Sequence, residues 1–256
     1  MRHLPISTNL FEKNRGLLSK RLPKQAIALI SANDFLPTNA DGHFPLHPNS
    51  DLFYLSGIEQ EETILLIFPD AEERRNREIL FIRKPNDEVK IWQGCKLSKK
   101  EARNISAIQT IHWIEEFDIV FQVLAAEVES IVLNENEHSR AVKAVETPVR
   151  LFNRVIQEKF PLHRIERLAP HLHHLRFAKD SEEINLIKQA IEITNRGFRK
   201  VLRMIKPGIM EFEVEAVLAG EFIKRRSKFA YPPIVASGAN ACVLHYHQND
   251  QTCKKG

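Results

Sequence analysis

The sequence has 256 residues, of which 43% are hydrophobic and 27% are charged, and 37 basic against 33 acidic side chains leave a net charge of +4. This composition is typical of a soluble globular protein with one large or two ordinary domains, and so small a charge excess argues against a nucleic-acid partner. The three cysteines are too few for a disulfide framework, and no apolar run approaches the roughly 20 residues that span a bilayer, so we expect a cytoplasmic protein without a membrane partner.

Up to about residue 160, short apolar runs alternate with helical patterns. Runs suited to strands that are covered on both faces occupy residues 26–30, 63–68, 79–82, 89–92 and 131–133. Helical spacing occurs over residues 114–126 and 139–160, and Pro148 interrupts the second stretch. The polar residues 48–51 lead into an aromatic strand or turn that Gly57 closes. The alternation predicts an α/β sandwich built on a mixed sheet.

From Leu175 onward the pattern is helical. Asp180 can cap a helix with Glu183 completing a capping box, and apolar residues then recur at threes and fours as far as Ile205. The Lys-Pro-Gly stretch at residues 206–208 ends this helix, and a second helix is expected over residues 211–227. A hairpin follows, with predicted strands at residues 234–236 and 242–244.

The domain boundary is expected within residues 161–174, where prolines interrupt the helical patterns. We therefore predict an N-terminal domain over residues 1–165 and a second domain that begins at residue 175 and runs to residue 256. The second domain is predicted to be incomplete, because its hairpin has an unpaired edge and its first helix has an uncovered apolar face.

His245 is the principal candidate for a catalytic residue, because it directly follows the second predicted hairpin strand. An imidazole at a strand end can transfer protons near neutral pH or stabilise a developing oxyanion. His247 lies on the same side of an extended segment, which suits substrate binding in a shared pocket. The simpler interpretations are that His245 is a packing residue and that His247 belongs to a solvated edge.

Two other groups of residues have a structural interpretation that we prefer. His171, His173 and His174 have no cysteine or carboxylate at ligand spacing, so a hydrated linker is favoured over a metal site. Cys242 stands between two apolar residues, which predicts a small buried side chain and not a nucleophile.

Five segments, in this order along the chain, resemble the aminopeptidase P (Xaa-Pro aminopeptidase) branch of the creatinase and prolidase superfamily. The segments cover nearly the whole chain; they read HPNSDLFYLSG, EVKIWQGCKLSKKEA, LRFAKDSEEINLIKQAIEIT, IKPGIMEFEVEA and YPPIVASGANACVLHYHQND. The resemblance implies a creatinase-type N-terminal domain followed by a catalytic domain of the pita-bread fold. It also implies a homo-oligomer, either a dimer or a tetramer, that acts on peptides with proline in the second position.

The resemblance further implies the chemistry of the site. Two divalent metal ions, usually Mn²⁺, activate a bridging hydroxide that attacks the bond before the proline. His245 matches the family's strand-end histidine, which contacts substrate and helps to stabilise the tetrahedral intermediate. The five metal ligands of the family lie beyond the position that matches Gly256. We therefore expect no tight manganese site and no peptidase activity from these 256 residues alone.

Several alternatives stay open on the sequence alone. The chain is either a fragment of a longer peptidase or a truncated product, and stability favours a fragment because half of a pita-bread domain would expose large apolar surfaces. The longer protein could be an Xaa-Pro dipeptidase, which shares the hairpin but accepts dipeptides only. It could also be a pita-bread module that has lost its metals and binds peptides or proteins.

Overall fold

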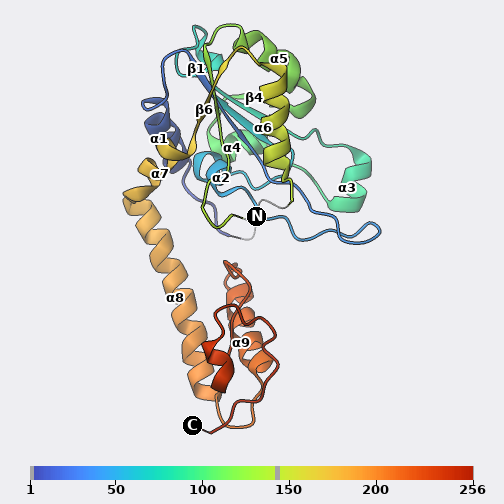
Figure 1. The fold of residues 1–256 in the computed structure, drawn as a ribbon, viewed down its shortest axis with the longest axis vertical. Helices are drawn as coiled ribbons and strands as arrows, with labels where there is room; N and C mark the ends of the chain where they lie inside the picture. The colour runs from blue at the N-terminus through green and yellow to red at the C-terminus, as the bar shows by residue number, and fades with distance from the viewer. Residues whose placement is uncertain (1–2, 142–144, 256) are drawn as a thin grey trace. The chain divides into compact units, whose positions relative to one another are not determined.

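The computed structural model describes residues 3–141 and 145–255. Their backbone contacts divide the chain into two compact units (Figure 1). The first unit comprises residues 5–178, and the second comprises residues 179–255 together with residues 3 and 4.

Within the described residues of the first unit, six strands form one mixed sheet in the order β4-β3-β2-β1-β5-β6. The strands are β1 (Ala26–Ser31), β2 (Ile64–Ile67), β3 (Glu78–Ile82), β4 (Thr110–Trp113), β5 (Ser130–Leu133) and β6 (Arg164–Arg167). The β1–β2 and β2–β3 pairs are antiparallel, whereas β3–β4, β1–β5 and β5–β6 are parallel. The predicted mixed sheet is thus confirmed.

Helices cover both faces of this sheet (Figure 1). They are α1 (Thr8–Ser19), α2 (Ser50–Ser56), α4 (Lys99–Ser106), α5 (Phe117–Ala125), α6 (Pro148–Lys159) and α7 (Ala169–Phe177), whereas α3 (Asp87–Gln93) lies apart from the sheet (Figure 1). Alternate residues of each central strand point to opposite faces: Ala28 and Ile30 of β1 pack with α1, α2, α4 and α7, while Ile27 and Leu29 pack with α5 and α6. Burial on both sides explains why the central strands have continuous apolar sequences.

Three sequence expectations for this unit are corrected. Residues 89–92 belong to helix α3, because acidic Asp87 and Glu88 suit a first helical turn and no described strand pairs with this segment. The segment before Gly57 is helix α2, whose first turn is capped by the Asn49 side chain, and only the closure at Gly57 was predicted correctly. Residues 139 and 140 form a turn, helix α6 starts at Pro148, and residues 142–144 of the predicted helix lie outside the described residues.

The first unit also extends beyond residue 165, where the sequence placed its end. Strand β6 pairs with β5, and Leu168 and Leu172 are almost fully buried in the core of the unit. The three neighbouring histidines therefore lie on helix α7 and not in a linker. Burial, together with Arg21, lowers the pKa of His171.

Gly57 ends α2 in the left-handed backbone region, with φ of 71°. A side-chain carbon at this position would lie 2.5 Å from the ring of Phe11, which belongs to α1. The left-handed turn favours glycine, and the close approach of α1 requires it.

The second unit begins with two helices, α8 (Ser181–Met204) and α9 (Glu211–Lys224). The predicted capping box between Asp180 and Glu183 is present, with the Asp180 N–H donating to Glu183 over 2.8 Å. Residues 206–208 follow the first helix as expected. The hairpin strands are not formed; residues 238–242 make a short 3₁₀ helix, because no described strand lies opposite residues 234–236 to complete a ladder.

No helix in the described ranges combines the length and hydropathy that are needed to cross a bilayer.

Candidate functional site

The segment that carries both candidate histidines is attached to the start of helix α9. The N–H of Glu211 donates to the carbonyl of Gln251 over 3.0 Å, and Cys253 exchanges backbone hydrogen bonds with the preceding turn at Gly208 and Ile209, each 2.8 Å long. Residues 251–253 therefore run alongside residues 208–211. This pairing places the loop of residues 237–251 next to the N-terminus of α9.

The carboxylate of Glu211 is fully buried and accepts four hydrogen bonds from this loop. Its Oε1 accepts from the backbone N–H and the hydroxyl of Ser237, over 2.6 and 2.7 Å. Its Oε2 accepts from the Tyr246 hydroxyl over 2.7 Å and from the Gln251 N–H over 3.0 Å. One side chain thus binds the start, the middle and the end of the loop.

These contacts determine the protonation of both partners. Burial by itself raises the pKa of Glu211, but the hydrogen bonds from Tyr246, Gln251 and Ser237 outweigh it and lower the pKa to about 2. Burial, followed by the hydrogen bond to Glu211, raises the pKa of Tyr246 to about 12. At neutral pH an ionised carboxylate therefore faces a neutral phenol.

Asn249 anchors the loop a second time. Its buried side chain donates to Glu215 Oε2 over 2.8 Å and to the carbonyl of Pro233 over 3.1 Å, and it accepts from the Val235 N–H over 3.0 Å. Its backbone φ is 49°, a left-handed conformation that asparagine tolerates better than most residues. The segment around residue 234 is therefore held by side-chain hydrogen bonds where a sheet ladder was expected.

The two candidate histidines lie on the outer side of this loop. Tyr246 is buried, whereas His245 and His247 are exposed on either side of it, with their ring centroids 6.1 Å apart and nearly perpendicular. The structure thus places the two imidazoles near each other, and their shared role in substrate binding stays a prediction. It does not place His245 at the end of a strand, because the preceding residues form the 3₁₀ helix.

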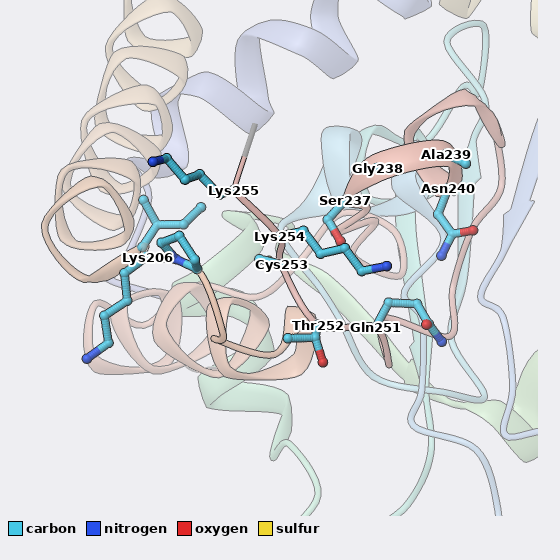
Figure 2. A pocket seen from close by; sticks show the side chains of 12 residues that line it. Lys206, Ser237, Gly238, Ala239, Asn240, Gln251, Thr252, Cys253, Lys254 and Lys255 are labelled. Atoms are coloured by element: carbon cyan, nitrogen blue, oxygen red, sulfur yellow. The ribbon is translucent and has the colours of Figure 1, made fainter.

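A pocket of about 710 Å³ lies beside both ends of this loop, lined by residues 205–207, 237–240 and 251–255. Figure 2 shows that its three lysines, Lys206, Lys254 and Lys255, point in different directions. Neither histidine lines the pocket. The side chains therefore do not converge on a single ligand position.

Two expectations about metal and thiol chemistry can be compared with these residues. Among residues 3–141 and 145–255, no three His, Cys, Asp or Glu side chains are grouped so that they could hold a metal ion. The described residues therefore do not fit a metal centre.

Cys242 is exposed, so its predicted burial is wrong; the expected strand would have covered it, and the 3₁₀ helix does not.

The sequence did not identify Glu211, Ser237 or Asn249 as site residues. An acidic residue at the first position of a helix is ordinarily a solvated residue near the helix dipole, and nothing local marks Glu211 as buried. The available signal was the tyrosine between two histidines, since an extended segment that exposes both histidines must turn the tyrosine inward, toward a hydrogen-bond partner.

Comparisons with known proteins match both units. Residues 11–133 match the model of the aminopeptidase P N-terminal domain, and residues 185–256 match the model of metallopeptidase family M24. Over 254 residues, 98% of the chain, the sequence is 25% identical to an Xaa-Pro aminopeptidase of Escherichia coli. It is 26% identical over 96% of the chain to an Xaa-Pro aminopeptidase of Haemophilus influenzae.

The fold is also similar to solved structures. A protein of Bacillus anthracis assigned as an aminopeptidase P superposes with a TM-score of 0.89 at 30% identity, over 98% of this chain and 60% of that one. The chain spans 57% of the length of the E. coli relative and 54% of the H. influenzae relative. The similarity therefore covers the N-terminal domain and the first part of the M24 domain.

Proposed function

Because the chain belongs to the aminopeptidase P branch of metallopeptidase family M24, we propose that the protein in which it occurs is a metal-dependent aminopeptidase. It releases the N-terminal residue from peptides with proline in the second position. The observation that supports this most directly is the order of the two matched domains, which in one chain align over 254 residues with an Xaa-Pro aminopeptidase.

Family M24 implies divalent metal ions, for which Mn²⁺ is our proposal. Since the described residues offer no suitable ligand group, we propose that the ligands lie outside this chain, and we assign no metal-dependent step to it. The contribution of this chain is then on the substrate side. His245, exposed and next to an anchored tyrosine, donates a hydrogen bond to the oxygen that becomes negatively charged during hydrolysis, and His247 contacts the peptide beside it.

The test is hydrolysis by the whole protein in the presence of manganese. We expect release of the first residue from an Xaa-Pro-Xaa tripeptide and much slower release from the matched Xaa-Ala-Xaa tripeptide. Turnover of the Xaa-Pro dipeptide alone would indicate an Xaa-Pro dipeptidase. Binding of peptides without any turnover would indicate a non-catalytic module, and both results would contradict the proposal.

For the 256 residues alone, we expect no release of amino acid and no micromolar binding of manganese by calorimetry. Hard divalent cations require several oxygen ligands, and His245, His247 and Asp250 supply a single carboxylate. Stoichiometric manganese binding by this chain would contradict the assignment of the ligands to residues outside it.

We also propose a homo-oligomer in the cytoplasm. Ile91 and Trp92 of helix α3 are 81% and 77% exposed, and large exposed apolar side chains are typical of protein interfaces. Cys95, Cys242 and Cys253 are all free thiols, which suits a reducing compartment. Light scattering coupled to size-exclusion chromatography measures the mass; a monomer at micromolar concentration would contradict the oligomer.

A further inference from the structure

The buried carboxylate of Glu211 has a second consequence, which concerns the direction of the two histidines. We propose that Glu211 is a positioning residue that holds His245 toward the substrate by fixing Tyr246 between the two imidazoles. The effect on catalysis rests on the proposed function. The anchoring itself rests on the contacts of Glu211 alone.

The loop has few backbone constraints of its own. Residues 243–248 are outside any described strand, so no ladder of backbone hydrogen bonds aligns them with a neighbour. The direction of an exposed side chain on such a loop depends on the few points at which the loop is attached. Glu211 supplies three of these points, at Ser237, Tyr246 and Gln251.

Tyr246 is the attachment point that matters for the histidines. Tyr246 is 6% exposed, and its hydroxyl lies 2.7 Å from Glu211 Oε2 and 3.1 Å from Asp250 Oδ1. His245 belongs to a turn at residues 244–245, and Tyr246 is the buried residue between two exposed histidines, so the inward Tyr246 holds both neighbours on the outer side of the loop. If the hydroxyl loses its buried acceptor, Tyr246 can rotate, and the rotation moves His245 and His247 with it.

A purely structural role for Glu211 is the alternative, and helix α9 provides a matched control for it. Glu221, on the same helix, is also buried, and hydrogen bonds from Lys200 and Arg225 lower its pKa to about 2. These two partners lie on α8 and directly after α9, and not in the loop of residues 237–251. Loss of the Glu221 carboxylate therefore weakens the second unit without releasing Tyr246.

The experiment compares Glu211→Gln, Tyr246→Phe and Glu221→Gln in the whole protein with manganese. The amide of Glu211→Gln cannot accept from all four donors. Tyr246→Phe removes only the phenolic hydroxyl, so this variant keeps the test valid if Glu211→Gln does not fold. In Glu211→Gln and Tyr246→Phe we expect kcat to fall about tenfold to 10²-fold with KM nearly unchanged. Displacing a catalytic group by about 1 Å can lower the rate about 10²-fold. Glu221→Gln should change kcat less than about twofold despite a lower melting temperature.

A second measurement does not depend on activity. In protein with ¹³C-labelled histidine, the imidazole ¹H–¹³C resonances of His245 and His247 are assigned by their loss in His245→Ala and His247→Ala. These resonances should shift in Glu211→Gln and Tyr246→Phe and not in Glu221→Gln. Equal resonances in all variants, or equal shifts in Glu221→Gln, would overturn the positioning role. If the wild-type protein does not cleave Xaa-Pro peptides, the proposed function fails, and the resonances alone then decide whether Glu211 fixes the histidines.

Discussion

Asp51 and Arg176 are 125 positions apart in the chain, and a carboxylate oxygen of the one lies 2.5 Å from a guanidinium nitrogen of the other. Asp51 is in the first turn of α2, and Arg176 is in the last turn of α7, where its guanidinium also lies 5.3 Å from the centre of the Tyr54 ring. This ion pair joins α7, the last helix of the first unit, to α2, which packs against the sheet. Helix α7 is therefore part of the folded N-terminal unit.

The ion pair predicts where a protease cuts. Lys179 is exposed between α7 and α8, outside any helix, whereas residues 171–174 are within α7. Brief trypsin treatment should cleave after Lys179 and leave a resistant fragment that ends there, as mass spectrometry would show. Cleavage after Arg176 as the first event would contradict the assignment of α7 to the first unit.

Phe121 is central to the apolar layer on one face of the sheet. It is 1% exposed, with its ring 5.3 Å from that of Phe117 and 5.0 Å from that of Phe160. Phe121→Ala should lower the free energy of unfolding by about 3–5 kcal/mol, because the cavity cannot close. Val123→Ala on the same helix, at a 63% exposed position, should change it by less than about 0.5 kcal/mol. Urea unfolding followed by tryptophan fluorescence measures both variants, because Trp92 and Trp113 both lie in the first unit, and equal values would contradict the packing.

Glu211 predicts an acid-dependent loss of stability. Its pKa of about 2 lies below the ordinary value of 4.5, so the ionised carboxylate stabilises the folded state above about pH 4.5, and this contribution is lost as the pH falls toward about 2. Glu211→Gln lacks the titrating group, so the stability difference from wild type should be largest near neutral pH and shrink in acid. Urea unfolding should be followed by far-ultraviolet circular dichroism, because both tryptophans lie in the first unit. A difference that stays constant with pH would contradict this prediction.

His245 and His247 are predicted to affect activity without affecting stability. Both side chains are exposed, so His245→Ala should leave the melting temperature within about one degree of wild type. In the whole protein kcat should fall by about 10²–10³, the usual loss for one oxyanion donor, and His247→Ala should have a smaller effect. A lower melting temperature with an unchanged kcat would identify His245 as a packing residue.

The cysteines should differ in their rate of reaction with Ellman's reagent. Cys95 and Cys242 are exposed, whereas Cys253 is partly buried against the apolar cluster of Val201, Ile209 and Val214. We expect two fast thiols and one slow thiol in the native chain. Cys242→Ser should remove one of the fast phases; loss of the slow phase instead would show that Cys242 is the covered thiol.

The sheet was predictable from the sequence where its strands are buried on both faces. Four of its strands, β1, β2, β3 and β5, occupy the centre of the sheet and appear as continuous apolar runs. The two that the sequence did not reveal, β4 and β6, are the edge strands. The sequence of β6, Arg-Ile-Glu-Arg, is mostly exposed and has no apolar run to detect.

The candidate site was predictable only in part. His245 and His247 stand out by their chemistry and spacing, and the structure brings them together. The residues that hold them could not be found, because burial of Glu211 depends on the path of a loop forty positions later in the chain. The local sequence predicts the helix cap at Asp180, but it cannot predict a contact between residues forty positions apart.

The glycine at the end of α2 limits how the N-terminal helix can change over evolutionary time. A bulkier residue at position 57 meets two separate obstacles, the left-handed turn and the Phe11 ring. Trimming Phe11 to a smaller side chain relieves the second obstacle, and the first is the lesser one, because Ala107 adopts a similar left-handed conformation at the end of α4. Sequences that retain this fold should therefore replace the glycine at position 57 only together with a smaller residue at position 11, so these two positions are expected to change as a pair.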